Sequence, residues 1–150
     1  MRLLVRRVED AKVEVNELIV GQIGAGLAVY VGIEMNDCQN DIEWSVKKIL
    51  GLRVFDDSDG KMNLPITSQM GLLIVSQFTL WGNLKKGYRP SFNRAAPPEF
   101  AESFYGSFLS SLRNSFPGDL QSGKFGAQMR IELHEDGPVT IWLDSKDKNY

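Results

Sequence analysis

Cysteine and histidine are nearly absent from this chain of 150 residues, which contains one of each, Cys38 and His134. A single cysteine excludes an internal disulfide, and one cysteine with one histidine cannot form the usual zinc site of Cys and His ligands. The chain also lacks a run of about 18 apolar residues and a basic leader followed by an apolar stretch. We therefore expect neither a membrane span nor secretion, and a cytoplasmic location fits these features.

Net charge is also small, at a formal value of −2, with 43% hydrophobic and 24% charged residues, as in soluble globular proteins. This balance argues against a protein that coats nucleic acid over a large surface, because such binding depends on many phosphate contacts. A local basic patch remains possible, since Lys85, Lys86, Arg89 and Arg94 fall within ten residues. The alternative interpretation of this segment is a solvated loop.

The hydrophobic pattern predicts strands at both ends of the chain. A hairpin is expected around Asn16, and the apolar runs that follow Gly26 and Gly71 are typical of strands buried on both faces. Near the C-terminus, residues 127–134 alternate cleanly and residues 139–144 do so again. Between them stands Gly137-Pro138, which we interpret as a turn between two strands, since proline usually sits at a strand's first residue, on an edge or at a bulge.

Two segments have the 3.6-residue period of helices. One runs to Gly51 with Asp37 or Asn40 as its cap, and the other begins at Pro97 or Pro98. The apolar stripe of the second consists of Phe100, Phe104, Phe108 and Leu112. The order of elements predicts a layered α/β fold for residues 1–150, taken as one domain, with mixed and antiparallel sheets and two main helices packed on one side.

Familiar site motifs are incomplete. Residues 118–125, GDLQSGKF, have the spacing of a phosphate-binding loop as far as Gly-Lys, but Phe125 replaces the hydroxyl residue that would hold magnesium. His134 lies on the polar face of an alternating strand, so a solvated imidazole is expected rather than a general base. An enzyme with this inventory must work largely without conventional acid and base side chains.

The segment VSQFTLWG, residues 75–82, places Ser76, Gln77 and Thr79 where a buried strand emerges from the apolar run before it. Active groups at the end of a rigid strand fit the general logic of sites in layered α/β folds. Ordinary polar alternation along a strand is the alternative.

SQFTL at 76–80 together with GPVT at 137–140 resembles the D-aminoacyl-tRNA deacylases of the common bacterial and eukaryotic type. The segments GLRVF, GKMN, KKGYRPSF, GKFGAQM and GPVTIWLD also follow the family's order along nearly the whole chain. The resemblance implies a fold of α/β/β layers and hydrolysis of the ester between a D-amino acid and the 3′-terminal adenosine of tRNA. It further implies removal of mischarged glycine, no metal or cofactor, and a homodimer with an active site across the subunit interface.

An activated ester mainly needs a positioned water and a stabilised oxyanion. Backbone N–H groups around Gln77, Phe78 and Thr79 are our candidates for the oxyanion hole. The Thr79 hydroxyl is expected to orient water or substrate, and either it or the 2′-hydroxyl of the tRNA takes the proton. Ser76 is a weaker candidate nucleophile because it has no identifiable base.

Selectivity is expected from Gly137 and Pro138, which form a cis peptide in the family and would face the SQFTL element of the other subunit. Val139 and Thr140 would hold this backbone wall. The remaining expected contacts are with the terminal adenosine, by Phe125, Gly126 and Met129, and with the tRNA backbone, by Lys85, Lys86 and Arg89. For Phe125 and Met129, packing in the core is the alternative.

Glu135 departs from the family pattern, which usually has asparagine two residues before the glycine of Gly-Pro. Asparagine commonly braces turns, whereas glutamate is longer and charged. Two alternatives to the deacylase therefore stay open. One is an esterase of changed specificity, and the other is a non-catalytic tRNA-binding protein that uses the basic patch.

Overall fold

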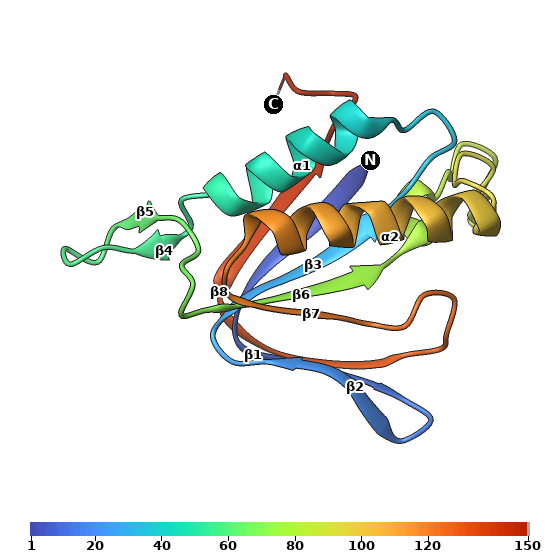
Figure 1. The fold of residues 1–150 in the computed structure, drawn as a ribbon. Coiled ribbons are helices and arrows are strands. Elements are labelled where there is room, and N and C mark those ends of the chain that lie inside the picture. Colours follow the sequence, from blue (N-terminus) through green and yellow to red (C-terminus); the bar gives the residue numbers. More distant parts are fainter. Residues whose placement is uncertain (150) are drawn as a thin grey trace.

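The computed structural model describes residues 1–149, and Figure 1 shows a curved sheet with two helices lying over the same side of it. The main sheet has the order β2-β1-β3-β6-β7, and β8 pairs with β1. The strands are β1 (Arg2–Val15), β2 (Leu18–Ile23), β3 (Gly26–Gly32), β6 (Gly71–Ser76), β7 (Asp119–Ser122) and β8 (Arg130–Asp144). Pairs β3–β6 and β6–β7 are parallel, and β1 pairs antiparallel with β2, β3 and β8. This architecture confirms the expected mixed α/β fold.

The remaining elements connect these strands. They are α1 (Gln39–Gly51), the small hairpin of β4 (Phe55–Asp56) and β5 (Met62–Leu64), the 3-10 turn η1 (Phe78–Trp81) and α2 (Pro98–Ser115). The helix α2 begins at Pro98, as the sequence predicted, because proline fits the first turn, where an N–H has no partner in the helix. No helix within residues 1–149 is long and apolar enough to cross a membrane.

The predicted cap of α1 is wrong. The helix is capped by Cys38, whose N–H donates to the Asp41 carboxylate at 2.8 Å. Asp37 is buried and already committed, since its carboxylate accepts the Glu34 N–H at 2.9 Å and the Met1 ammonium at 2.5 Å. A carboxylate with these two partners is not available to the helix.

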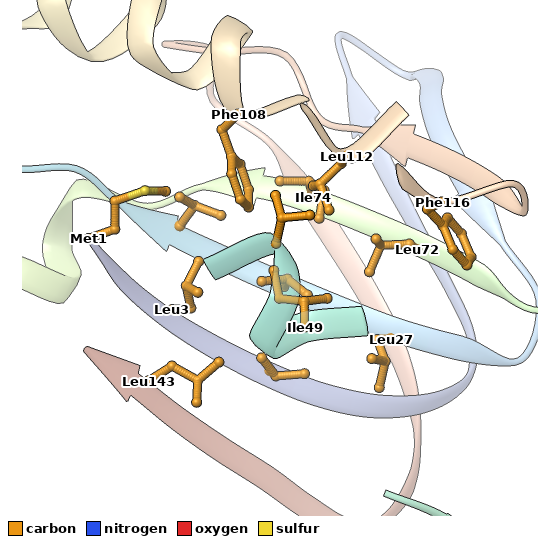
Figure 2. Packing of buried hydrophobic residues seen from close by; sticks show 14 of the residues in the cluster. Met1, Leu3, Leu27, Ile49, Leu72, Ile74, Phe108, Leu112, Phe116 and Leu143 are labelled. Carbon is orange, nitrogen blue, oxygen red and sulfur yellow. The ribbon is translucent and has the colours of Figure 1, made fainter. Parts of the chain in front are cut away.

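Two apolar clusters cover the two faces of the sheet. The larger lies between the sheet and the helices, where Phe108 and Leu112 of α2 and Ile49 of α1 meet Leu72 and Ile74 of β6 (Figure 2). All five side chains are essentially fully buried, and each such side chain stabilises the fold by about 1.5–3 kcal/mol. The smaller cluster lies on the opposite face and consists of Val8, Ala11, Val13, Ile23, Ala28, Leu73 and Val75.

Two strand predictions need correction. β7 was not foreseen, because its short polar sequence DLQS shows no hydrophobic alternation and its pairing with β6 is long-range. β8 is one strand and not two strands joined by a turn, since its segments on both sides of Gly137-Pro138 pair with β1. The Gly-Pro segment is therefore a bulge, in which residues 136–139 lie opposite Arg7 alone.

Candidate active site

The end of β6 opens into a cavity of about 690 Å³. Ser76, Gln77 and Phe78 form one wall of this cavity, where the strand passes into η1. The turn lies close against β3 because Gly32 has no side chain, and the Gln77 N–H donates to the Val31 carbonyl at 2.7 Å. A strand end locked to its neighbour therefore positions the turn.

That same hydrogen bond corrects one expectation, since the Gln77 N–H is already used and cannot also serve an oxyanion. The N–H groups of Phe78 and Thr79 open the 3-10 turn, where the first donors have no acceptor inside a helix. The Gln77 side-chain amide donates to the Thr79 hydroxyl oxygen at 2.6 Å, which leaves the hydroxyl proton of Thr79 free to point elsewhere. Thr79 is exposed beside the cavity wall.

Trp81 anchors the other end of η1 and is buried. The Arg2 guanidinium lies 3.9 Å from the centre of its ring and that of Arg94 lies 4.4 Å from it. Arg2 also donates to the Leu80 carbonyl at 3.0 Å, and Arg94 pairs with the buried Glu34 at 3.1 Å. Arg94 therefore supports the turn, and its side chain is still 52% exposed.

The rest of the lining comes from distant parts of the chain. Phe125, Gly126 and Met129 belong to it, together with residues that the sequence did not predict for the site, namely Phe92, Ala95, Ala96, Pro97, Pro98, Ala101, Ala127 and Ile131. The sequence could have indicated Pro97 and Pro98 as lining residues, because they fix where α2 begins. Phe92, whose ring packs edge-on against Phe78 at 5.0 Å, carried no such signal.

None of the side chains that line this cavity is ionisable. Tyr105 lies behind it, with its ring 5.7 Å from that of Phe125 and its hydroxyl donated to the Ile74 carbonyl at 2.9 Å. Burial raises the pKa of the Tyr105 hydroxyl far above its usual range, so it stays neutral. Within residues 1–149 no group of three or more His, Cys, Asp or Glu could hold a metal ion.

His134 is exposed, as expected, and its Nδ1 lies 2.8 Å from the Asp10 carboxylate across β1 and β8. The hydrogen bond to Asp10 and the charge of that carboxylate raise the pKa of the imidazole. His134 is not part of the cavity wall.

The Gly137-Pro138 segment does not line this cavity. Its peptide bond is cis, and both residues are exposed, as is Thr140, while Val139 is buried in the larger core. Arg7 holds the preceding residue, because its Nε donates to the Asp136 carbonyl at 3.0 Å and contacts the Asp136 carboxylate at 3.0 Å. Within one chain the two predicted halves of the site therefore remain apart.

Lys85, Lys86 and Arg89 are all exposed on the loop that follows η1. The loop is shaped locally, since the Asn83 side chain accepts the Lys85 N–H at 2.9 Å. None of these three side chains lines the cavity.

The sequence profile of the D-Tyr-tRNA(Tyr) deacylase family matches residues 4–144. The chain belongs to this family. A D-aminoacyl-tRNA deacylase from Thermosipho melanesiensis is 48% identical over 147 residues, which cover 97% of this chain and 98% of that protein. One from Fusobacterium nucleatum is 47% identical over 150 residues, with 99% of each chain covered.

Two solved structures have a similar fold. The c-Myc DNA unwinding element binding protein superposes with a TM-score of 0.91 at 44% identity, covering 96% of this deacylase-family chain and 98% of its own. A probable eukaryotic D-amino acid tRNA deacylase superposes with a TM-score of 0.80 at 18% identity, covering 95% and 97%, which shows the shared fold.

Proposed function

We propose that this deacylase-family protein hydrolyses the ester between a D-amino acid and the 3′-terminal adenosine of tRNA, releasing free D-amino acid and tRNA. The observation that carries the proposal is a largely apolar cavity without ionisable side chains, lined by Phe78 at the start of η1, where the first N–H groups have no acceptor inside the turn. Such a site suits an ester that is already activated. The protein is thus a hydrolase acting on ester bonds, and residues 1–150 form one deacylase domain.

The chemistry needs little from side chains. Water adds to the ester carbonyl carbon, the N–H groups of Phe78 and Thr79 stabilise the oxyanion, and the bond to the 3′-oxygen then breaks as that oxygen takes a proton. Each donor of this kind contributes roughly 3–4 kcal/mol. Because Gln77 already donates to the Thr79 oxygen, the Thr79 hydroxyl acts as a donor that orients water or substrate. We assign the role of proton acceptor to the 2′-hydroxyl of the terminal adenosine, because no side chain that lines the cavity is ionisable.

Ser76 is not proposed as a nucleophile. The one histidine of the sequence, His134, lies outside the cavity wall and is paired with Asp10. A serine hydroxyl without an adjacent base is a weak nucleophile. Phe125, Gly126 and Met129 also line the cavity, and we assign them to the terminal adenosine.

Selection of the D-isomer is assigned to Gly137 and Pro138 of a second copy of the chain. In one chain these residues are exposed and do not reach the cavity, while Phe78 at the cavity mouth is 58% exposed. A homodimer that apposes the two segments would turn the Gly-Pro carbonyls toward the α-amino group. An L side chain would collide with this wall, a D side chain would point to solvent, and glycine would be accepted for lack of a side chain.

The buried Val139 ties this wall to the core, and Thr140 continues the strand beyond it. The exposed Lys85, Lys86 and Arg89 are assigned to phosphates of the tRNA acceptor end, since lysine and arginine side chains make such contacts. The biological role is proofreading in the cytoplasm, where removal of D-amino acids and misattached glycine returns tRNA to translation.

Release of D-tyrosine, L-tyrosine and glycine from the matching charged tRNAs tests the proposal. We expect catalytic turnover of the D-tyrosyl and glycyl esters and no acceleration of L-tyrosyl hydrolysis. Comparable rates on both tyrosyl isomers would instead indicate an esterase of changed specificity. A stoichiometric complex with charged tRNA and no turnover would indicate a binding protein and would refute the deacylase.

A further inference from the structure

The bulge that carries Gly137-Pro138 has a narrow neck. Arg6 of β1 pairs with Thr140 at one end of the bulge, and Val8 pairs with Glu135 at the other end. Between these two pairs, β8 contributes residues 136–139 and β1 contributes Arg7 alone. A segment of this size outside the strand ladder has no ladder hydrogen bonds of its own, so its orientation depends on side-chain contacts. Arg7 holds Asp136 and Val139 packs in the core, and the contact across the neck adds to these two.

One ion pair spans this neck. Arg6 lies opposite Thr140, yet its guanidinium Nη2 pairs with the Glu135 carboxylate at the far end. The two side chains are 28% and 35% exposed, so the pair lies at the surface with each side chain partly covered by the protein. The Arg6 Nε is buried and has no acceptor among residues 1–149, which leaves Glu135 as the anion that compensates its charge.

A neighbour from β3 shows that the pair lies against the body of the sheet. Burial raises the pKa of the Tyr30 hydroxyl, with Arg6 acting to lower it and Glu135 acting to raise it. Both charges are therefore close to a half-buried aromatic side chain. Solvent and salt screen such a pair less than one that projects fully into water.

We propose that Arg6 and Glu135 form a positioning pair, which closes the neck of the bulge and sets the direction in which Gly137 and Pro138 present their backbone. The inference rests on the proposed role of this backbone in selecting the D-isomer. It also accounts for the departure at position 135. A glutamate is tolerated there because Arg6 supplies the cation that its longer, charged side chain requires.

The test compares single and double variants of the pair with a control pair on the same two strands. Arg6→Met and Glu135→Gln each remove one charge, and the double variant Arg6→Glu with Glu135→Arg reverses the pair. Glu132→Gln is the control, because Glu132 pairs with Lys12 at 3.1 Å between the same two strands but outside the bulge. For every protein, kcat/KM is measured on D-tyrosyl-tRNA and L-tyrosyl-tRNA together with the melting temperature. Amide hydrogen exchange of Gly137 and Val139 is followed by NMR.

Each single variant is expected to lower the D-over-L ratio of kcat/KM at least fivefold and to speed exchange at Gly137 and Val139. The reversed pair should restore the ratio to within about twofold of the wild type, because coupled partners compensate each other. Glu132→Gln should leave both the ratio and the exchange unchanged. If a single variant changes its melting temperature no more than the control and retains the wild-type ratio and exchange, the positioning role is wrong.

Failure of the proposed function has a different signature. A wild-type protein that does not hydrolyse D-tyrosyl-tRNA would refute the deacylase, and the exchange measurement would still show whether the pair orders the bulge. Faster exchange at Gly137 in Glu135→Gln, rescued in the reversed pair, would support the neck contact independently of turnover. An unchanged exchange pattern would overturn it.

Discussion

Gly32 is the last residue of β3 and lies directly against the 3-10 turn that carries the proposed oxyanion donors. A methyl group on its Cα would sit 3.0 Å from the Gln77 carbonyl oxygen, 3.0 Å from Leu80 Cβ and 3.2 Å from Trp81 Cδ1. The Gln77 backbone cannot yield freely, because its N–H is bonded to the Val31 carbonyl at 2.7 Å. We expect Gly32→Ala to displace η1 from β3 by a few tenths of an ångström.

The magnitude follows from two opposing effects. Overpacking costs about 1–3 kcal/mol, while alanine in a strand is favoured over glycine by about 0.5–1 kcal/mol, so the net loss of stability is about 0–2.5 kcal/mol. For a chain of this length the melting temperature falls by at most several degrees. A displacement that forfeits roughly a quarter of the 3–4 kcal/mol of an oxyanion donor lowers kcat by about fivefold.

The assay is kcat at saturating D-tyrosyl-tRNA, measured beside the melting temperature. Gly24→Ala is the matched control, because nothing lies within 4 Å of the methyl group that it would add. The control should retain wild-type kcat and stability. A Gly32→Ala protein that matched the control in both measurements would show that the turn is not held against β3 as described, and the proposed donors would lose their structural support.

Three further outcomes are expected. Thr79→Val should lower kcat at least roughly tenfold while Thr79→Ser stays within about threefold, since the serine keeps the hydroxyl; equal rates would remove this hydroxyl from the mechanism. Replacing Lys85 and Lys86 by alanine should weaken tRNA binding and flatten its dependence on salt, measured by titration at several salt concentrations. In a pH titration by NMR, the raised pKa of His134 should fall in Asp10→Asn. Because the folded pKa is raised, the extra stability of the wild type over Asp10→Asn is full below about pH 6.5 and is lost as pH rises through the folded pKa.

The sequence predicted the periodic elements well. The helix α2 begins at Pro98 as expected, and two residues of its predicted stripe, Phe108 and Leu112, are fully buried. The two misread strands share one cause. Local hydrophobic patterns do not indicate which strands pair. The sequence therefore predicted neither the parallel pairing of β7 with β6 nor the pairing of both parts of β8 with β1.

The sequence predicted the position of candidate residues that depends on their neighbours along the chain. It did not predict contacts between residues that are far apart in the sequence. Ser76, Gln77 and Phe78 lie at a strand end, and that position was readable from the apolar run before them. The sequence could not predict which N–H groups are free to bind an oxyanion. The Gln77 N–H donates to the carbonyl of Val31, and Val31 lies on another strand. Glu135 stood out as a departure, but its partner Arg6 became apparent only from the register of β1 and β8.

The apolar lining of the cavity has a consequence for how the reaction responds to its buffer. No side chain that lines the cavity is ionisable, so the dependence of the rate on pH would show no pKa of a cavity side chain. Its inflections would belong to groups that arrive with the RNA, namely the α-amino group of the ester and the ribose hydroxyls. The substrate would thus supply the acid–base behaviour of the reaction, and the protein would supply its fixed dipoles and its shape.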